Sequence, residues 1–273
     1  MTQNDPLQKV KNFVHLLQSI YGNIRYGFPA KKLKILAITG SDGKTTSTMM
    51  LYHILQKSGI KVGYISTIGA RIGDEELDTG LHVTTPDPWM VPKYLRMMVD
   101  QGIEYVVMEA TSNGLEQNRL WGITFSGGLI TNIKSDHLDY HKTWENYARA
   151  KFKLITQLSS GAPIVINKED TKSYKWIKKE ITRLNLKQDF NLIEVKLEDV
   201  KEAQFSLDGF SFILDSQKFN LQLLGKYNLE NALGVIALAR HLLPLEVIAK
   251  SLESFRAPKG RMELVQTKPF TVI

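Results

Sequence analysis

The chain has 273 residues, of which 43% are hydrophobic and 23% charged, a globular composition with room for one large domain or two small ones. This composition excludes a disordered or collagen-like chain, and the absence of cysteine excludes disulfides, thiolate zinc sites and a cysteine nucleophile. The 35 Lys and Arg against 28 Asp and Glu give a net charge of +7, which favours an anionic small molecule such as a nucleotide over nucleic acid. We therefore expect a cytoplasmic protein with no nucleic-acid partner.

The first predicted element is an amphipathic helix with basic flanks. Its apolar residues recur at helical spacing and are called the apolar stripe below: Val10, Phe13, Val14, Leu17, Tyr21 and Ile24. We expect the apolar stripe to pack on the domain that follows, because most apolar helical faces point to a core. Weak contact with a membrane surface is the alternative. The uncharged residues 12–24 are too few to span a bilayer, so no membrane span is expected.

From residue 33 short β-rich runs alternate with helical stretches, which is typical of an α/β fold. The pattern predicts strands at 34–39, 61–65, 105–109, 128–131 and 164–167, and helices near 44–58, 88–101, 144–158, 171–183, 228–242 and 245–255. We expect a mostly parallel central sheet with helices on both faces. Apolar and polar residues alternate between about residues 190 and 223, around a turn at Asp208-Gly209, which predicts a small antiparallel hairpin region.

The chain is expected to have three parts. Residues 1–32 form an N-terminal extension, and residues 33–258 form a central nucleotide-binding domain. Residues 259–273 are interpreted as a linker followed by strand material, at 263–265 and 270–273, that begins a further C-terminal domain.

The sharpest motif, Thr-Gly-Ser-Asp-Gly-Lys-Thr-Thr at residues 39–46, lies between a predicted strand and a predicted helix. Glycines let backbone N–H groups surround phosphate oxygens, Lys44 can bridge phosphates, and a threonine hydroxyl can bind Mg²⁺. Only two residues separate the glycines, against four in the usual phosphate loop, so the flanking strand and helix support the assignment. The residues predicted to bind ATP here are Gly40, Ser41, Asp42, Gly43, Lys44, Thr45 and Thr46.

Two further polar groups follow predicted strands, at the sheet edge where α/β proteins bind ligands. Glu109 ends the strand at 105–109, where it is either a Mg²⁺ ligand or a solvated strand end. The run Asp-His-Leu-Asp-Tyr-His at 136–141 fits a divalent ion or phosphate groups. Helix capping by Asp136 with a packed His141 is the alternative, and spacing alone leaves both open.

Six separated motifs, between about residues 33 and 263, resemble those of the Mur ligases in kind and order. They are residues 39–46, Thr-Thr-Pro-Asp at 84–87, Met-Glu-Ala-Thr-Ser-Asn-Gly-Leu at 108–115, Thr-Asn at 131–132, 136–141, and Gly-Arg-Met-Glu at 260–263. The chain most resembles the branch that adds the third residue to UDP-MurNAc-L-Ala-D-Glu. The resemblance implies an ATP-dependent carbon–nitrogen ligase of peptidoglycan precursor synthesis that works through an acyl phosphate.

The same resemblance implies two Mg²⁺ sites. One lies between Thr45 and Glu109, and the other is held by Glu109, His137 and Lys151. A lysine ammonium repels cations, whereas its carbamate is an oxygen ligand of the kind Mg²⁺ prefers, so we expect Lys151 to be carbamylated. Lys44, Glu109, His137 and Lys151 are the expected catalytic residues.

The resemblance also implies how the substrates are held. The acceptor UDP-MurNAc peptide is expected at Thr84, Thr85, Thr111, Gln117 and Arg119. Asn228 or Asn231 is expected to contact adenine, with helix N-capping as the alternative for both, and Arg261 to approach the terminal phosphate. The expected partners are the UDP-MurNAc peptide and an amino acid, and a separate C-terminal-domain chain is a further candidate partner. A noncatalytic or partner-dependent ATP-binding module is the alternative function, because the resemblance leaves the amino-acid-binding domain outside residues 33–258.

Overall fold

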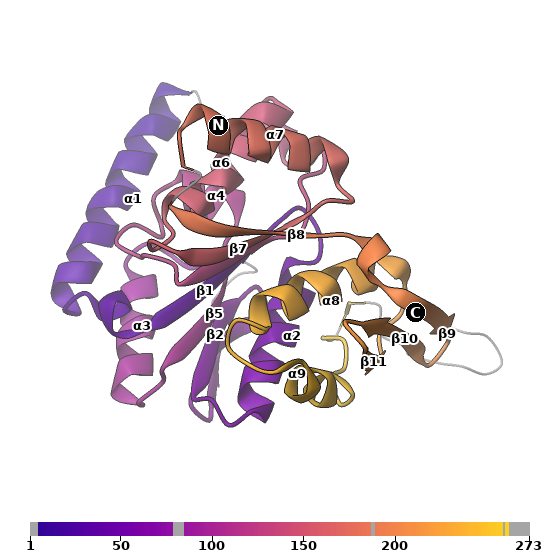
Figure 1. The fold of residues 1–273 in the computed structure, drawn as a ribbon. Coiled ribbons are helices and arrows are strands. Elements are labelled where there is room, and N and C mark those ends of the chain that lie inside the picture. The colour runs from indigo at the N-terminus through magenta and orange to yellow at the C-terminus, as the bar shows by residue number, and fades with distance from the viewer. Residues whose placement is uncertain (1–4, 79–84, 187–188, 259, 262–273) are drawn as a thin grey trace.

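The computed structural model describes residues 5–78, 85–186, 189–258 and 260–261. Its centre is an eight-stranded sheet in the order β4-β3-β2-β5-β1-β6-β7-β8, with helices on both faces (Figure 1). The strands from β2 to β8 in this order pair in parallel, and β3 and β4 add an antiparallel edge. Their bounds are β1 Lys34–Thr39, β2 Val62–Ser66, β3 Gly69–Ile72, β4 Glu75–Leu77, β5 Tyr105–Glu109, β6 Gly127–Ile130, β7 Ala162–Asn167 and β8 Phe190–Val195. The predicted α/β class with a mostly parallel sheet is confirmed.

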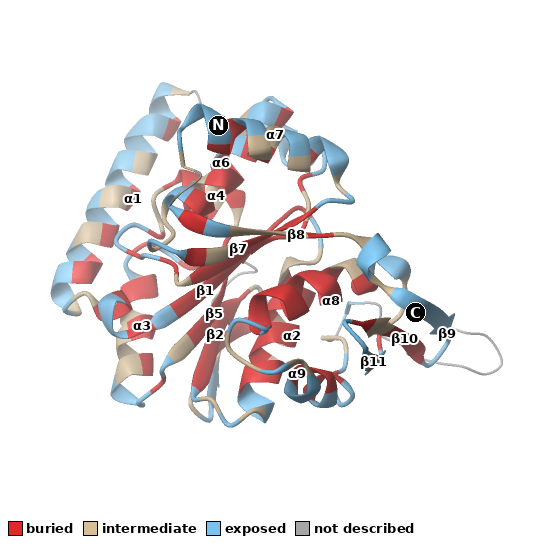
Figure 2. Ribbon diagram, in the orientation of Figure 1, coloured by how far each residue is buried: buried red, intermediate tan, exposed pale blue. Residues whose placement is uncertain are grey.

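Two hydrophobic cores lie on opposite faces of this sheet. Along β1, Ile35 and Ala37 join one core while Leu36 and Ile38 join the other, because successive strand side chains point to opposite faces. One core is covered by α3 (Met90–Asp100), α6 (Trp144–Thr156) and α7 (Thr171–Arg183), and the other by α2 (Lys44–Lys57), α8 (Lys226–Ala239) and α9 (Leu245–Leu252). Figure 2 shows the buried central strands and the buried inner sides of these helices.

A three-stranded antiparallel sheet belongs to the second core. Its strands are β9 (Lys201–Ser206), β10 (Gly209–Leu214) and β11 (Gln217–Leu221). The rings of Phe212 and Phe219 stack with centroids 5.0 Å apart, in the same core as α2 and α8.

The predicted start of the antiparallel hairpin region, at about residue 190, is wrong. Residues 190–195 form β8, which pairs in parallel with β7 at the edge of the main sheet, after the crossover helix α7. A half-exposed edge strand shows the same apolar–polar alternation as a hairpin strand, so the pattern could not separate the two.

Six short elements in the described part of the chain were not predicted: β3, β4, α4 (Ser112–Glu116), α5 (Leu138–His141) and the 3-10 helices η1 (Pro29–Lys32) and η2 (Leu197–Asp199). Segments of three to five residues are too short to show a period. The predicted strand material at 263–265 and 270–273 lies outside the described residues. The domain limits at residues 32 and 258 stay predictions.

The N-terminal helix α1 (Pro6–Arg25) packs against the domain with its polar face. Asn12 Nδ2 donates to the Glu116 carboxylate at 3.0 Å, and Ser19 Oγ donates to the Asn118 carbonyl at 2.8 Å. The residues of the apolar stripe are instead 44% to 64% exposed. The expected packing of the apolar stripe on the domain is therefore wrong, because the surface beneath α1 presents a carboxylate and carbonyls that need donors. Among the described residues, no helix has the length and apolar character to cross a bilayer.

Because the small sheet packs in the second core, we expect its buried side chains to contribute to the free energy of unfolding. Replacing Phe219, which is fully buried, by Ala should lower the free energy of unfolding by about 3 to 5 kcal/mol, because the cavity opens inside the core shared with α2 and α8. Urea unfolding followed by circular dichroism measures this change. Phe205→Ala, on the same sheet but 50% exposed, is the matched control and should cost less than about 1 kcal/mol. Equal effects of the two substitutions would show that the small sheet does not share the core.

Candidate functional site

The predicted phosphate loop lies between the end of β1 and the start of α2. The first turn of α2 begins at Lys44, and Gly43 before it has a left-handed φ of 79°. A β-carbon at Gly43 would lie 2.2 Å from Asn231 Oδ1, and one at Gly40 would lie 1.8 Å from Thr131 Oγ1. Both positions therefore require glycine, which lets the loop backbone approach the neighbouring strand end and α8.

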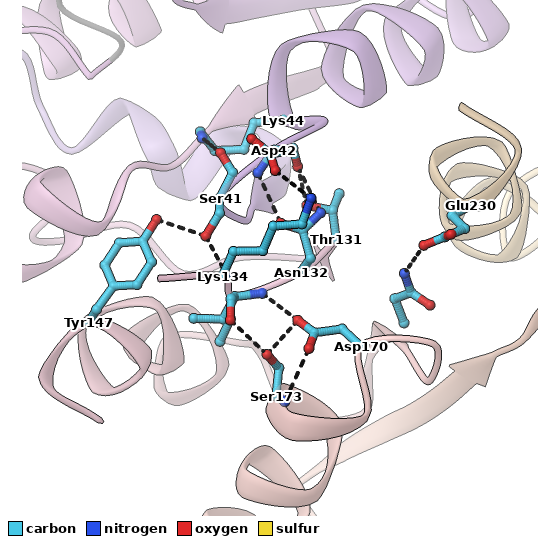
Figure 3. Close-up of polar contacts among 12 residues, drawn as sticks. Ser41, Asp42, Lys44, Thr131, Asn132, Lys134, Tyr147, Asp170, Ser173 and Glu230 are labelled. Carbon is cyan, nitrogen blue, oxygen red and sulfur yellow. Dashed lines mark hydrogen bonds and ion pairs between the residues drawn. The ribbon is translucent and has the colours of Figure 1, made fainter. Parts of the chain in front are cut away.

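The loop backbone is held by residues that follow β6. Asn132 accepts from the Ser41 N–H through its carbonyl and from the Asp42 N–H through Oδ1, both at 2.9 Å. Thr131 Oγ1 donates to the Asp42 carbonyl at 2.6 Å, and Lys134 pairs with the Asp42 carboxylate at 2.8 Å (Figure 3). These contacts fix the loop before any ligand binds.

Thr45 and Glu109 lie together at the carboxyl edge of the sheet. The Thr45 hydroxyl is 3.1 and 3.2 Å from the two Glu109 carboxylate oxygens, and Thr67 also donates to Glu109. Glu109 is 1% exposed, so the alternative of a solvated strand end is wrong. Hydroxyl and carboxylate oxygens are the ligands that Mg²⁺ prefers, so this pair fits the ion.

Lys151, on the inner side of α6, lies directly beneath the phosphate loop. Its Nζ donates to the Gly40 carbonyl at 2.5 Å and lies 4.4 Å from the centroid of the Tyr147 ring. Burial, followed by the nearby charge of Lys44, lowers the pKa of Lys151 well below its usual range. Burial therefore favours the neutral form of this amine over the charged form.

The two histidines of residues 136–141 have different environments. His137 has a left-handed φ of 52°, and its side chain is 53% exposed, 3.5 Å from the Asp136 carboxylate. His141 is fully buried, and its Nε2 lies 3.1 Å from Ser112 Oγ. Burial, with the nearby Lys151, lowers the pKa of His141 to about 4. The predicted packing of His141 is confirmed. The N-cap of α5 is His137, without a side-chain cap, and Asp136 Oδ1 accepts only from the adjacent His137 N–H.

The predicted metal ligands come together only in part. Thr45 and Glu109 are in contact. Lys151 and His137 share Tyr147 as a neighbour, since the His137 and Tyr147 rings have centroids 6.0 Å apart. Within the described parts of the chain, no group of three or more His, Asp and Glu side chains converges as a ligand set.

A cleft of about 940 Å³ extends from the phosphate loop to α8 and to Arg261. Asn228 Nδ2 donates to the Leu224 carbonyl at 2.8 Å, and Asn231 Nδ2 donates to Asn228 Oδ1 at 3.2 Å. The N-cap of α8 is Gly225, without a side-chain cap, so the alternative of N-capping by either asparagine is wrong. Both asparagines and Arg261 line the cleft together with the phosphate loop.

Four of the five predicted acceptor residues form one hydrogen-bonded group, and Thr84 lies outside the described residues. The hydroxyls of Thr85 and Thr111 are 2.8 Å apart. Arg119 donates to the Thr85 carbonyl at 3.1 Å and to Gln117 Oε1 at 2.8 Å. Burial lowers the pKa of Arg119. The group is thus pre-formed, with Arg119 as its cation.

Sequence reasoning gave no site role to three residues in or beside the cleft, although Asn132 belongs to the motif at 131–132. Asn132 follows the predicted strand at 128–131 and Asn167 ends the strand at 164–167, so the strand-end rule that selected Glu109 could have found both. Tyr147 donates to or accepts from Ser41 Oγ at 3.0 Å, and burial raises the pKa of its phenol to about 12. No local signal marks Tyr147, because its partner is 106 residues away in the chain.

The comparisons with known proteins agree with this geometry. The family model described as the Mur ligase middle domain matches residues 38–239. The chain is 36% identical over 264 residues to the UDP-N-acetylmuramoyl-L-alanyl-D-glutamate--2,6-diaminopimelate ligase of Clostridium perfringens, an alignment that covers 91% of this chain and 52% of that protein. It is 38% identical over 264 residues to the enzyme of the same name from Clostridium tetani, with coverage of 94% and 52%.

A solved structure of a UDP-N-acetylmuramoyl-L-alanyl-D-glutamate--2,6-diaminopimelate ligase superimposes with a TM-score of 0.73 at 27% identity, over 86% of this chain and 48% of that one. The chain spans about half the length of the curated relatives it matches. The family match covers most of the sheet, the phosphate loop and α8, which are the parts that build the cleft. The chain therefore belongs to the Mur ligase family, through its middle domain.

Proposed function

We propose that this chain supplies the ATP-binding part of an acid–amino acid ligase that adds the third residue to UDP-MurNAc-L-Ala-D-Glu in peptidoglycan precursor synthesis. The observation that carries this proposal is the buried Lys151 amine, 2.5 Å from the carbonyl of Gly40 in the phosphate loop. A simple nucleotide-binding domain gains nothing from a buried amine there. The curated relatives are named 2,6-diaminopimelate ligases, so that diamino acid is the first amine to test. The absence of cysteine supports a cytoplasmic setting.

In the proposed arrangement, residues at the sheet edge would hold two Mg²⁺ ions. Thr45 and Glu109 would hold the first through oxygens that already lie together. Glu109, His137 and a carbamylated Lys151 would hold the second, with His137 turning away from Asp136. When bound, Mg²⁺ offsets the repulsion between ATP and the acceptor carboxylate.

The proposed reaction has two steps. A carboxylate oxygen of the acceptor attacks the γ-phosphorus of ATP, and the bond between that phosphorus and the β-phosphate oxygen breaks. The products of this step are ADP and an acyl phosphate. The incoming amine then attacks the acyl carbon, phosphate departs with the bond electrons, and the amine gives up a proton to leave an amide. Lys44 stabilises charge on the transferring phosphoryl group, because its amine lies at the phosphate loop.

The remaining cleft residues take binding roles in this proposal. Asn228 or Asn231 contacts adenine from α8, and Arg261 approaches the terminal phosphate. The hydrogen-bonded group of Thr85, Thr111 and Arg119 holds the acceptor, together with Gln117 and the undescribed Thr84. Arg119 supplies the positive charge for an anionic group of the acceptor.

Loss of Lys44 should weaken nucleotide binding and abolish turnover. We expect Lys44→Ala to weaken binding of Mg-ATP at least roughly tenfold, since a charge-assisted phosphate contact is lost. Calorimetry on the whole chain measures the affinity, and ADP release with acceptor and diaminopimelate measures turnover. Lys57→Ala, at the exposed far end of α2, is the control. ATP binding without acceptor-dependent ADP release would support the noncatalytic module instead.

Lys151 should become carbamylated at neutral pH when bicarbonate is present. We expect a carbamate carbon signal by NMR in the chain incubated with ¹³C-bicarbonate, because the lowered pKa leaves the amine neutral enough to react. The signal should fall as the pH drops through the Lys151 pKa, where the amine becomes protonated. Lys151→Ala should lack the signal, whereas Lys153→Ala, two residues along α6, should keep it. A signal that survives in Lys151→Ala would overturn the carbamate assignment.

Arg119 should contribute to the affinity for the acceptor and not to the affinity for the nucleotide. We expect Arg119→Ala to weaken binding of UDP-MurNAc-L-Ala-D-Glu at least roughly tenfold while leaving Mg-ATP affinity unchanged, because only the acceptor group loses its cation. Titration calorimetry with each ligand separates the two effects. Arg149→Ala, on the exposed side of α6, is the matched control. Unchanged acceptor affinity in Arg119→Ala would remove this residue from the acceptor site.

A further inference from the structure

Helix α1 presents its apolar side to solvent and its polar side to the protein. The apolar stripe runs along the whole helix, and its residues are 44% to 64% exposed. The opposite side buries Gln8, His15, Ser19 and Asn23 against the domain. In Figure 2, α1 lies along the outside of the molecule and is mostly exposed. An exposed apolar stripe of this length marks an interaction surface.

The polar contacts hold α1 in this orientation. Three hydrogen bonds join its beginning, middle and end to one segment of the domain: Asn12 to Glu116, Ser19 to Asn118 and Asn23 to Trp121. At the last of these turns Gly22 leaves little space, since a β-carbon there would lie 3.2 Å from Trp89 Cα. The helix cannot rotate its apolar stripe inward without breaking these contacts, so the stripe remains available to a partner.

The segment that contains α1 carries most of the net positive charge of the protein. Residues 6–34 contain six Lys and Arg and no Asp or Glu, so this segment has a net charge of +6. The whole chain has a net charge of +7, so all other residues together contribute only +1. These cations are Lys9, Lys11, Arg25, Lys31, Lys32 and Lys34, and all are exposed. Lys9 and Lys11 lie on opposite sides of the helix from each other, so cations border both edges of the apolar stripe.

From these observations we infer that α1 docks the protein onto an anionic lipid surface, with the apolar stripe in the acyl boundary and the flanking cations at the headgroups. A stripe of large apolar side chains bordered by cations is the pattern of helices that lie in the plane of a membrane interface. A second copy of the chain is a poorer partner, because it would bring two clusters of six cations together.

Vesicle binding by the whole chain, without nucleotide, tests this inference independently of the proposed ligase activity. We expect the chain to float with phosphatidylglycerol vesicles and not with phosphatidylcholine vesicles. Binding should weaken as the salt concentration rises from about 50 mM to about 500 mM, since the electrostatic part is screened. Absence of binding to the anionic vesicles at low salt would overturn the inference.

Paired variants separate the two components of the surface. Val14→Ser with Leu17→Ser should abolish binding, whereas Leu207→Ser, at a residue 61% exposed on the small sheet, should not change it. Lys9→Gln with Lys11→Gln should weaken binding roughly 25-fold, at about fivefold for each cation near an anionic surface. The matched charge control is Lys175→Gln with Lys179→Gln on the exposed side of α7, which should bind normally.

Thermal unfolding checks that each variant keeps its fold, and all the substituted residues are exposed, so folding should be retained. Equal binding of the α1 and α7 lysine variants would overturn the assignment to α1. A concentration-dependent dimer in sedimentation velocity that Val14→Ser with Leu17→Ser dissolves would also overturn it, in favour of a second copy as the occupant of the stripe.

Discussion

The hydrogen bond from Lys151 to the Gly40 carbonyl is the contact around which the site is organised. It places an amine in the protein interior directly beneath the phosphate loop, where a charge is costly and the neutral form is favoured. Tyr147 covers the same amine with its ring and ties the loop through Ser41. An apolar residue would avoid the cost of burying the amine, so stability alone does not account for a lysine at this position.

The parallel sheet brings the other polar groups to the same edge. β1 lies between β5 and β6, so the loop after β1 has Glu109 from one neighbour and Asn132 from the other within reach. β7 ends one strand further on, and its Asn167 donates to Glu230 of α8 across the cleft. Parallel strands all end at one side, which is why residues from four separate segments line one cleft.

Helix α1 departs from the usual rule that the apolar side of a helix faces the core. The surface beneath it includes Glu116 and the backbone carbonyls of Asn118 and Trp121, which apolar side chains would leave without donors. The polar side of α1 satisfies these groups, and its apolar stripe is left in solvent. The same segment carries Gln117 and Arg119, two residues of the proposed acceptor site.

Local features were predictable from the sequence. The predicted bounds of β1 and β5 match the structure, the loop at 39–46 joins β1 to α2 as expected, and the strand-end rule brought Glu109 to the cleft. Each depends on a few neighbouring residues, whose hydrophobic period and turn chemistry are local properties. The parallel pairing of β8, the solvent-facing stripe of α1 and the contact of Tyr147 with Ser41 were decided only by tertiary structure. These features join segments far apart in the chain, and the free energy of burying or pairing a group depends on a partner that local sequence does not reveal.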